Sequence, residues 1–308
     1  MTAPGARAAG IRAPGPARVA PAWLDLRESA DAAARAPELL APLRHRATGR
    51  SGLEVHDLGC GTGAMGRWLA ARLPGPQHWV MYDHDPDLLH HAATGVTGTT
   101  TAADGAPVAV ATRVRDVTTL VAGDLAGAWL VTASALLDLL TRDEVDRIAD
   151  ACVAAACPAL ITMSVVGRVA LTPPDPLDRE IAAAFDAHQR RRVGGLPLLG
   201  PDAVDAAVEA FTRRGATVLV RPSAWRLGPR DYRLIGAWLR GWVAAACEQS
   251  PALAVRAAGY LDRRLAAVAA GGLRVVVGHR DLLAQPGDAG APGAHAAAGP
   301  VPNRSDSA

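Results

Sequence analysis

The stretch LEVHDLGCGTGAMG, residues 53–66, decides the fold of this chain. Its first half, 53–58, is typical of a short buried strand, and residues 64–73 have the composition of a helix that Pro74-Gly75 ends. The glycines between them let the backbone turn tightly and pass close to a ligand without a Cβ in the way. Such a strand–turn–helix unit is typical of α/β proteins, which bind ligands at the carboxyl ends of parallel strands.

Strands and helices alternate along most of the chain. After 53–58, the pattern predicts strands at 78–82, 108–114, 128–132, 159–165, 217–221 and 273–278. It predicts helices at 23–43, 64–73, from Asp85-Pro86 onward, 142–156, 177–192, 202–213, 231–247 and 252–269. Strands separated by helices indicate a seven-stranded, mainly parallel sheet with helices on both faces.

The bulk composition narrows the class of protein. The 308 residues include 32 basic and 30 acidic ones, a balance that does not favour nucleic acid or an anionic membrane as partner. The four cysteines form no C-x-x-C pair, so we expect no disulfide framework and no metal site. No apolar stretch has the length of a membrane span and no signal peptide is visible, so we expect a cytoplasmic protein. Residues 1–20 and 286–308 are predicted to be disordered tails around one domain, 21–285.

The glycine turn matches two cofactor patterns. Residues 61–66 satisfy the dinucleotide fingerprint G-x-G-x-x-G, and residues 57–63 satisfy D-x-G-x-G-x-G, a pattern of S-adenosylmethionine (SAM) binding. A carboxylate at Asp57 would repel a pyrophosphate but attract the sulfonium and ammonium groups of SAM. Further acids end the second and third predicted strands, at Asp83 and Asp116. Three acids on three strand ends favour SAM.

Four segments make the chain resemble the class I SAM-dependent methyltransferases: HDLGCGTG (56–63), VMYDHDPDLL (80–89), VRDV (114–117) and WLVTASALLDLL (129–140). The resemblance implies a three-layer α/β/α Rossmann-like fold whose last strand is antiparallel, with SAM as cofactor. It would place the following residues at SAM: Asp57, Gly59, Cys60, Gly61 and Gly63 at the methionine half, Asp83 at the ribose, His84 and Val117 at the adenine ring, Asp116 at the adenine amine, and Ser134 beside the methionine or the substrate.

Residues 222–272 depart from that family, whose sixth and seventh strands usually form a close antiparallel pair. We interpret this segment as a helical insertion that covers the substrate. Trp238 and Trp242 lie four residues apart on one predicted helix, which is typical of a core stripe rather than an aromatic cage.

The acceptor is predicted to be a small molecule that is methylated at oxygen. The segment after the fourth strand has no Asn/Asp-Pro-Pro-Tyr/Phe motif, which argues against a planar amino nitrogen. The catalytic residue is not determined by the sequence: His188, Asp138 and Tyr232 are the candidates for a general base, whereas His279 is interpreted as a turn residue.

Two other functions stay open. One is an NAD(P)-dependent oxidoreductase, against which Asp57 and the absence of any lysine for a Tyr-x-x-x-Lys pair argue. The other is a non-catalytic SAM-binding protein. The sequence predicts no oligomeric state.

Overall fold

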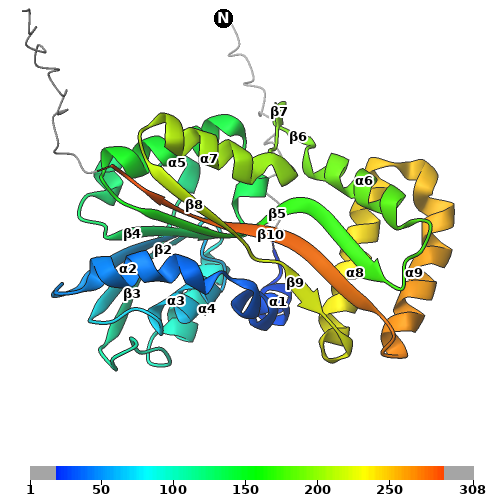
Figure 1. Ribbon diagram of the computed structural model, residues 1–308, viewed down its shortest axis with the longest axis horizontal. Helices are drawn as coiled ribbons and strands as arrows, with labels where there is room; N and C mark the ends of the chain where they lie inside the picture. The colour runs from blue at the N-terminus through cyan, green and yellow to red at the C-terminus, as the bar shows by residue number, and fades with distance from the viewer. Residues whose placement is uncertain (1–18, 288–308) are drawn as a thin grey trace, which may run out of the picture.

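The computed structural model describes residues 19–287, so the predicted tails lie almost wholly outside the described part. One mixed sheet dominates it, with the order β3-β2-β1-β4-β5-β10-β8 and the short β9 beside β10 (Figure 1). Neighbouring strands are parallel except at β10, which is antiparallel to β5, β8 and β9. The predicted mainly parallel sheet with an antiparallel last strand is confirmed. The strands are β1 (Leu53–Leu58), β2 (Gln77–Asp83), β3 (Val108–Val114), β4 (Leu130–Ser134), β5 (Ala159–Thr172), β8 (Thr217–Pro222), β9 (Trp225–Leu227) and β10 (Arg274–Gln285).

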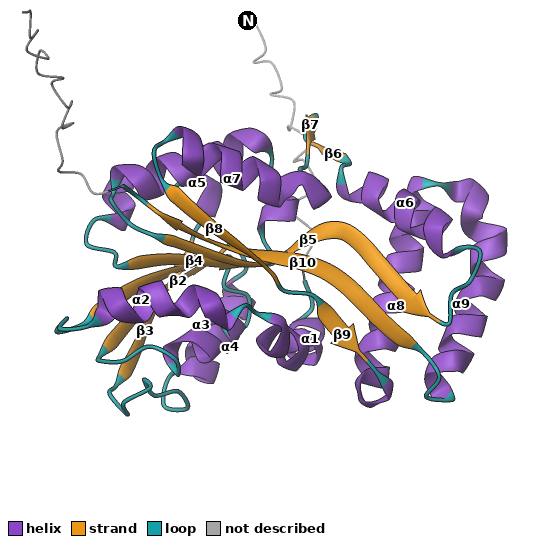
Figure 2. Ribbon diagram, in the orientation of Figure 1, coloured by secondary structure: helices purple, strands orange, loops and turns teal. Residues whose placement is uncertain are grey.

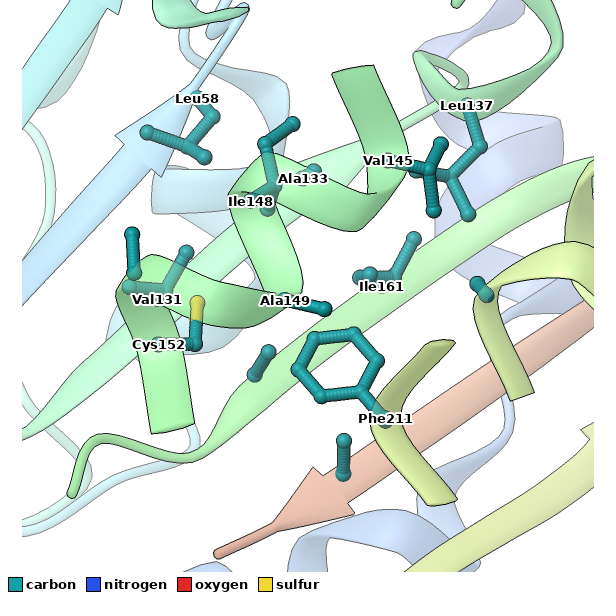
Figure 3. Close-up of a cluster of buried hydrophobic side chains, with 14 of the residues drawn as sticks. Leu58, Val131, Ala133, Leu137, Val145, Ile148, Ala149, Cys152, Ile161 and Phe211 are labelled. Carbon is teal, nitrogen blue, oxygen red and sulfur yellow. The ribbon is translucent and has the colours of Figure 1, made fainter. Parts of the chain in front are cut away.

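Helices cover both faces of this sheet (Figure 2). On one face lie α5 (Arg142–Ala154) and α7 (Ala203–Arg213), which bury Ile148 and Phe211 against Ile161 of β5 (Figure 3). On the other face lie α2 (Leu40–Ala47), α3 (Ala64–Ala70) and α4 (Pro86–Val96), around a second core that includes Leu69 and Trp79. Burial of these apolar faces is the main force that holds the layers together.

The predicted helix 23–43 is wrong as one continuous element. It is divided into α1 (Pro21–Ala34), the 3₁₀ turn η1 (Pro37–Leu39) and α2. Pro37 has no N–H to donate and disfavours helical geometry at Ala36, which is extended with φ −75° and ψ 103°. The Ala36 N–H donates instead to Asp281 Oδ2 at 2.9 Å. The break therefore places Arg35 in the interior, where it is 3% exposed.

β5 and β10 are far longer than the predicted 159–165 and 273–278, because bulges interrupt the alternation of their side chains. The register shifts between Val277 and His279 and again between Arg280 and Leu282. At the second shift two residues of β5 oppose Asp281 alone, and one of them, Met163, has φ 58°. Asp281 Oδ1 accepts the Met163 N–H at 2.8 Å, so the buried carboxylate satisfies the backbone of the bulge.

The far halves of β5 and β10 carry a further layer (Figure 1). It consists of α6 (Asp178–Gln189), α8 (Tyr232–Gln249) and α9 (Ala254–Ala269), which enclose a third core with β9. Segment 222–272 thus contains the two helices expected there, and also β9, which was not predicted. Trp242 is buried in this core and stacks on Trp238 at 4.9 Å between ring centroids.

The remaining elements are short. The predicted helix 177–192 ends early, and residues beyond it form a hairpin of β6 (Arg192–Val193) and β7 (Leu196–Pro197). The other 3₁₀ turns are η2 (Val117–Thr119), η3 (Ala122–Leu125), η4 (Leu137–Leu139), η5 (Gly200–Asp202), η6 (Pro229–Asp231) and η7 (Pro251–Leu253). Among residues 19–287, no helix has the length and apolar character needed to cross a membrane.

Replacing Asp281 by alanine should lower the free energy of unfolding by roughly 2–6 kcal/mol, since two buried N–H donors lose their acceptor at about 1–3 kcal/mol each. Urea denaturation followed by circular dichroism measures the loss. Asp205→Ala, which removes an exposed carboxylate paired with Arg280, is the control and should change stability by less than about 0.5 kcal/mol. Equal, small effects of the two variants would contradict the structural role of Asp281.

Candidate functional site

The glycine turn joins β1 to α3 at the carboxyl end of the sheet. Gly59, Gly61 and Gly63 have φ values of 62°, 54° and 83°, a region that residues with a Cβ occupy at a cost. At Gly63 a Cβ would also lie 3.2 Å from the Ala92 backbone. Between them, the Cys60 N–H donates to the Tyr82 carbonyl at 2.9 Å, which ties the turn to β2. The spacing seen in the sequence therefore marks three positions where the chain needs glycine.

Asp57 lies in β1 beneath the turn and is fully buried. Its Oδ1 accepts a hydrogen bond from Thr132 Oγ1 at 2.7 Å. Its Oδ2 has no hydrogen-bond partner among the described residues. Burial raises the pKa of Asp57 to about 7, although the Thr132 hydroxyl and the charge of Arg35 oppose the rise.

Asp83 ends β2 and fixes the turn from the side. Its Oδ2 accepts the Gly61 N–H and its Oδ1 the Asp85 N–H, each at 3.0 Å. The ring of His84 follows, about half exposed, with Nδ1 3.4 Å from Asp83 Oδ1. A carboxylate has more acceptor positions than these two bonds use, so Asp83 keeps capacity for a ligand.

Two adjoining cavities open at this edge. The smaller has a volume of about 60 Å³ and lies between α1, the glycine turn and Asp57. The larger, of about 350 Å³, runs from Gly61, Asp83 and His84 toward β9 and α8. The two share residues of α1 and the turn, as well as Ser134 at the end of β4. A ligand that fills both would extend along the carboxyl ends of β1, β2 and β4.

The far wall of the larger cavity is mainly aromatic and apolar. Three of the seven tryptophans of the chain (Trp23, Trp225 and Trp238) and one of its two phenylalanines (Phe185) line it. In a chain with so few aromatic residues, this concentration indicates a surface for an apolar or planar group.

Two titratable residues interrupt that wall. Asp138 follows β4, and burial raises its pKa to about 6, against the opposing charges of Arg27 and Arg191. His279 of β10 packs on Trp225 at 5.3 Å between ring centroids, and burial lowers its pKa to about 3. Its Nδ1 has no partner within residues 19–287. His279 is therefore a cavity residue inside a strand, and its interpretation as a turn residue was wrong.

Two residues expected at the adenine lie outside the walls of both cavities. Asp116 is exposed, and its carboxylate accepts the Thr118 N–H at 2.9 Å and the Thr118 hydroxyl at 2.7 Å, which caps η2. Val117 is buried in the core under α5. Neither lines one of the two cavities. The adenine roles of both remain predictions.

Of the three candidate bases, only Asp138 lines one of these two cavities. His188 lies on α6 with Nε2 3.3 Å from Glu248 Oε2 of α8. Tyr232 begins α8 and is 58% exposed.

Two arginines of the site were not anticipated. Arg27 of α1 pairs with Asp31 at 2.9 Å and lies over Trp225 with 5.1 Å to the ring centroid. Its spacing of four residues from Asp31 was a visible signal of an intrahelical pair. The sequence did not indicate that Arg35 is buried at the site, because position 35 fell within the predicted continuous helix 23–43. Within residues 19–287, no three His, Cys, Asp or Glu side chains gather as metal ligands would.

No family model matches the sequence, and no curated protein matches it. Among solved structures, the chain is similar to a cyclopropane synthase from Mycobacterium tuberculosis, at 14% identity over 80% of this chain and 83% of that one, with a TM-score of 0.41. It is similar to a SAM-dependent methyltransferase from Methanosarcina mazei, at 11% identity over 80% and 98% of the two chains, with a TM-score of 0.44.

A third similar structure is phosphoethanolamine N-methyltransferase 2 from Haemonchus contortus in complex with phosphomonomethylethanolamine and S-adenosylhomocysteine. The identity is 16%, the TM-score 0.40, and the match covers 81% of this chain and 52% of that one. The fold assignment rests on the strand order of this chain itself, with the antiparallel β10 between β5 and β8. The chain has the three-layer fold of the class I methyltransferases.

Asp57→Asn should stabilise the ligand-free protein, and more so as the pH rises from about 5 to about 8. The pKa of Asp57 is higher in the folded protein, about 7, than the ordinary 3.8, so ionisation above pH 4 costs the folded state progressively more stability until the pH passes 7. Asparagine keeps an acceptor for Thr132 without the charge. Urea unfolding of both proteins at the two pH values measures the difference in their free energies of unfolding. Other titrating groups contribute equally to both proteins and cancel. If this difference did not change with pH, the raised pKa of Asp57 would be contradicted.

Proposed function

We propose that this protein is a SAM-dependent methyltransferase that methylates a small molecule at oxygen. One observation carries the proposal: the charged cavity beneath the glycine turn adjoins a larger cavity that reaches an aromatic wall. Such a pair can hold the cofactor and the acceptor end to end. The positioning of two reactants in line is most of what an enzyme must supply for methyl transfer.

The residues of the site fit SAM. Asp57 has a free buried oxygen for a cationic group, where a pyrophosphate would be repelled. Asp83 can accept the ribose hydroxyls while it holds Gly61. Ser134 lies where the two cavities meet. Bound SAM supplies a methyl group on a sulfonium, which is already activated toward a nucleophile.

The proposed oxygen specificity rests on Asp138 and His279. An acid with a pKa of about 6 is mostly ionised at neutral pH and can accept a hydroxyl proton. His279 stays neutral, so its unpartnered Nδ1 can form a hydrogen bond that orients the same hydroxyl. Trp225 and Trp238 would cover the body of the acceptor. An apolar or aromatic hydroxy compound is the acceptor class that this wall favours.

Asp83→Ala should weaken the binding of S-adenosylhomocysteine (SAH) by roughly 10- to 150-fold, equivalent to about 1.5–3 kcal/mol for hydrogen bonds to a charged group. Isothermal titration calorimetry with SAH, and separately with NADH, provides the measurement. Asp104→Ala is a matched control, since Asp104 also accepts two backbone N–H bonds but lines neither cavity. Binding of NADH but not SAH by the wild-type protein would overturn the proposed cofactor.

Asp138→Asn should lower kcat for a phenolic acceptor by about 10²- to 10⁴-fold, the usual contribution of a general base. The wild-type rate should fall as the pH drops below about 6, because protonated Asp138 cannot accept the proton. Transfer of labelled methyl from SAM to a panel of phenols, aliphatic alcohols, carboxylic acids and amines tests both points. His188→Ala, whose ring faces Glu248, should keep wild-type kcat; transfer to amines alone would contradict the oxygen specificity.

A further inference from the structure

The smaller cavity contains two buried groups of opposite charge whose hydrogen-bonding capacity is incomplete. Arg35 is 3% exposed and Asp57 is fully buried, and both line this cavity. Arg35 Nη1 and Asp57 Oδ2 are each without a hydrogen-bond partner among residues 19–287. Buried charged atoms are normally paired, so two open ones in a single cavity point to a ligand.

The guanidinium of Arg35 is held in a fixed orientation. Its Nη2 donates to Ser134 Oγ at 3.1 Å and its Nε donates to Thr162 Oγ1 at 3.4 Å. Its flat face lies over Trp68, 5.2 Å from the ring centroid. The neighbouring Ala36 N–H is bound to Asp281, which fixes the backbone as well. Two of the three nitrogens are therefore occupied by the protein, and the third remains for the cavity.

The opposite charges of Arg35 and Asp57 on the cavity walls restrict which ligand can bind between them. An anion alone would pair with Arg35 but would meet the carboxylate of Asp57, and a cation alone would pair with Asp57 but would meet Arg35. A group that carries an ammonium and a carboxylate on the same carbon satisfies both walls and leaves the charge balance of the interior unchanged. Arg35 is suited to the carboxylate because its guanidinium is charged and its Nη1 still has N–H donors that no protein group uses.

We propose that Arg35 binds the carboxylate of the α-amino-acid end of the cofactor, opposite Asp57, which takes the ammonium. The inference rests on the proposed function, since SAM and SAH carry such an end. It adds a cofactor-binding residue from outside the glycine turn. The break between α1 and η1 is what places this residue at the cavity. It also makes the amino-acid end a main determinant of which nucleosides the protein binds.

The test compares nucleosides with and without that end. Calorimetric titration of the wild-type protein with SAH and with 5′-methylthioadenosine, which lacks the amino acid, should show tighter binding of SAH. Arg35→Met keeps an apolar stem over Trp68 but removes the cation. It should weaken SAH by roughly 10- to 150-fold, as expected for the loss of hydrogen bonds between charged groups, and leave 5′-methylthioadenosine unchanged.

Two controls separate binding from folding. Arg264→Met removes another buried arginine, 4% exposed, which contacts Asp178 and lies outside both cavities; it should leave the ratio of the two affinities unchanged. Decarboxylated SAH keeps the ammonium and lacks the carboxylate, so the wild-type protein should bind it roughly 10- to 150-fold more weakly than SAH, even if Arg35→Met does not fold.

The outcomes are distinct for the two proposals. Equal affinities of the wild-type protein for SAH and decarboxylated SAH would overturn the role of Arg35 and leave the methyltransferase proposal standing. An equal loss of SAH and 5′-methylthioadenosine affinity in Arg35→Met would also overturn it, because that pattern indicates a structural role. Failure of the wild-type protein to bind any of the three nucleosides would instead overturn the proposed function.

Discussion

The carboxylate of Asp281 is the interaction on which the site depends. It is fully buried, and it accepts hydrogen bonds from the Ala36 N–H, the Met163 N–H and the Ser223 hydroxyl. The first bond fixes the break after α1, the second satisfies the bulge in β5, and the third anchors the chain just before β9. One side chain thus positions three segments that are distant in the sequence. The smaller cavity takes a wall from the first of these segments, and the larger cavity takes walls from α1, β5 and β9, so this one acceptor helps to set the shape of both.

This arrangement places several charged groups in the interior, which lowers the stability of the ligand-free protein because these groups lose their hydration. Burial lowers the pKa of Arg35 and raises the pKa of Asp281 and Asp57, so each group is less readily charged than in water. Arg27 and Asp31 offset part of that cost by pairing with each other, and Asp31 also accepts the Trp225 indole N–H at 2.9 Å. Arg35 and Asp57 are not paired in this way. Each keeps one buried atom without a hydrogen-bond partner, which is expected at a site that a ligand completes, since functional sites are where such local exceptions are tolerated.

The sequence was sufficient for the glycine turn, because positive φ and close approach restrict those positions to glycine and leave a visible pattern. It was also sufficient for β1 to β3: the apolar runs of β1 and β2 match buried parallel strands, and β3 follows as a mostly exposed strand at the edge of the sheet. It failed for β10, where His279 and Asp281 look like the polar end of a strand although both are buried. Their environment depends on bulges and on partners from α1, β5 and β8, none of which has a local signature. Arg35 was missed for the related reason that its burial follows from a bond made by its neighbour to Asp281.

At the proposed acceptor end of the site, the charge of Arg27 influences the protonation of two residues, Asp138 and His279. Burial acts on Asp138 and His279 in opposite directions, raising the pKa of the acid to about 6 and lowering that of the base to about 3. Arg27 favours the ionised form of Asp138 and disfavours the protonated form of His279. Its charge therefore lowers the pKa of both groups. Above pH 6 the wall therefore carries an anion and a neutral imidazole. Because the pKa of Asp138 is the higher of the two, in the proposed oxygen methylation a proton released by an acceptor hydroxyl would go to Asp138, and His279 would serve as a hydrogen-bonding partner that does not compete for it.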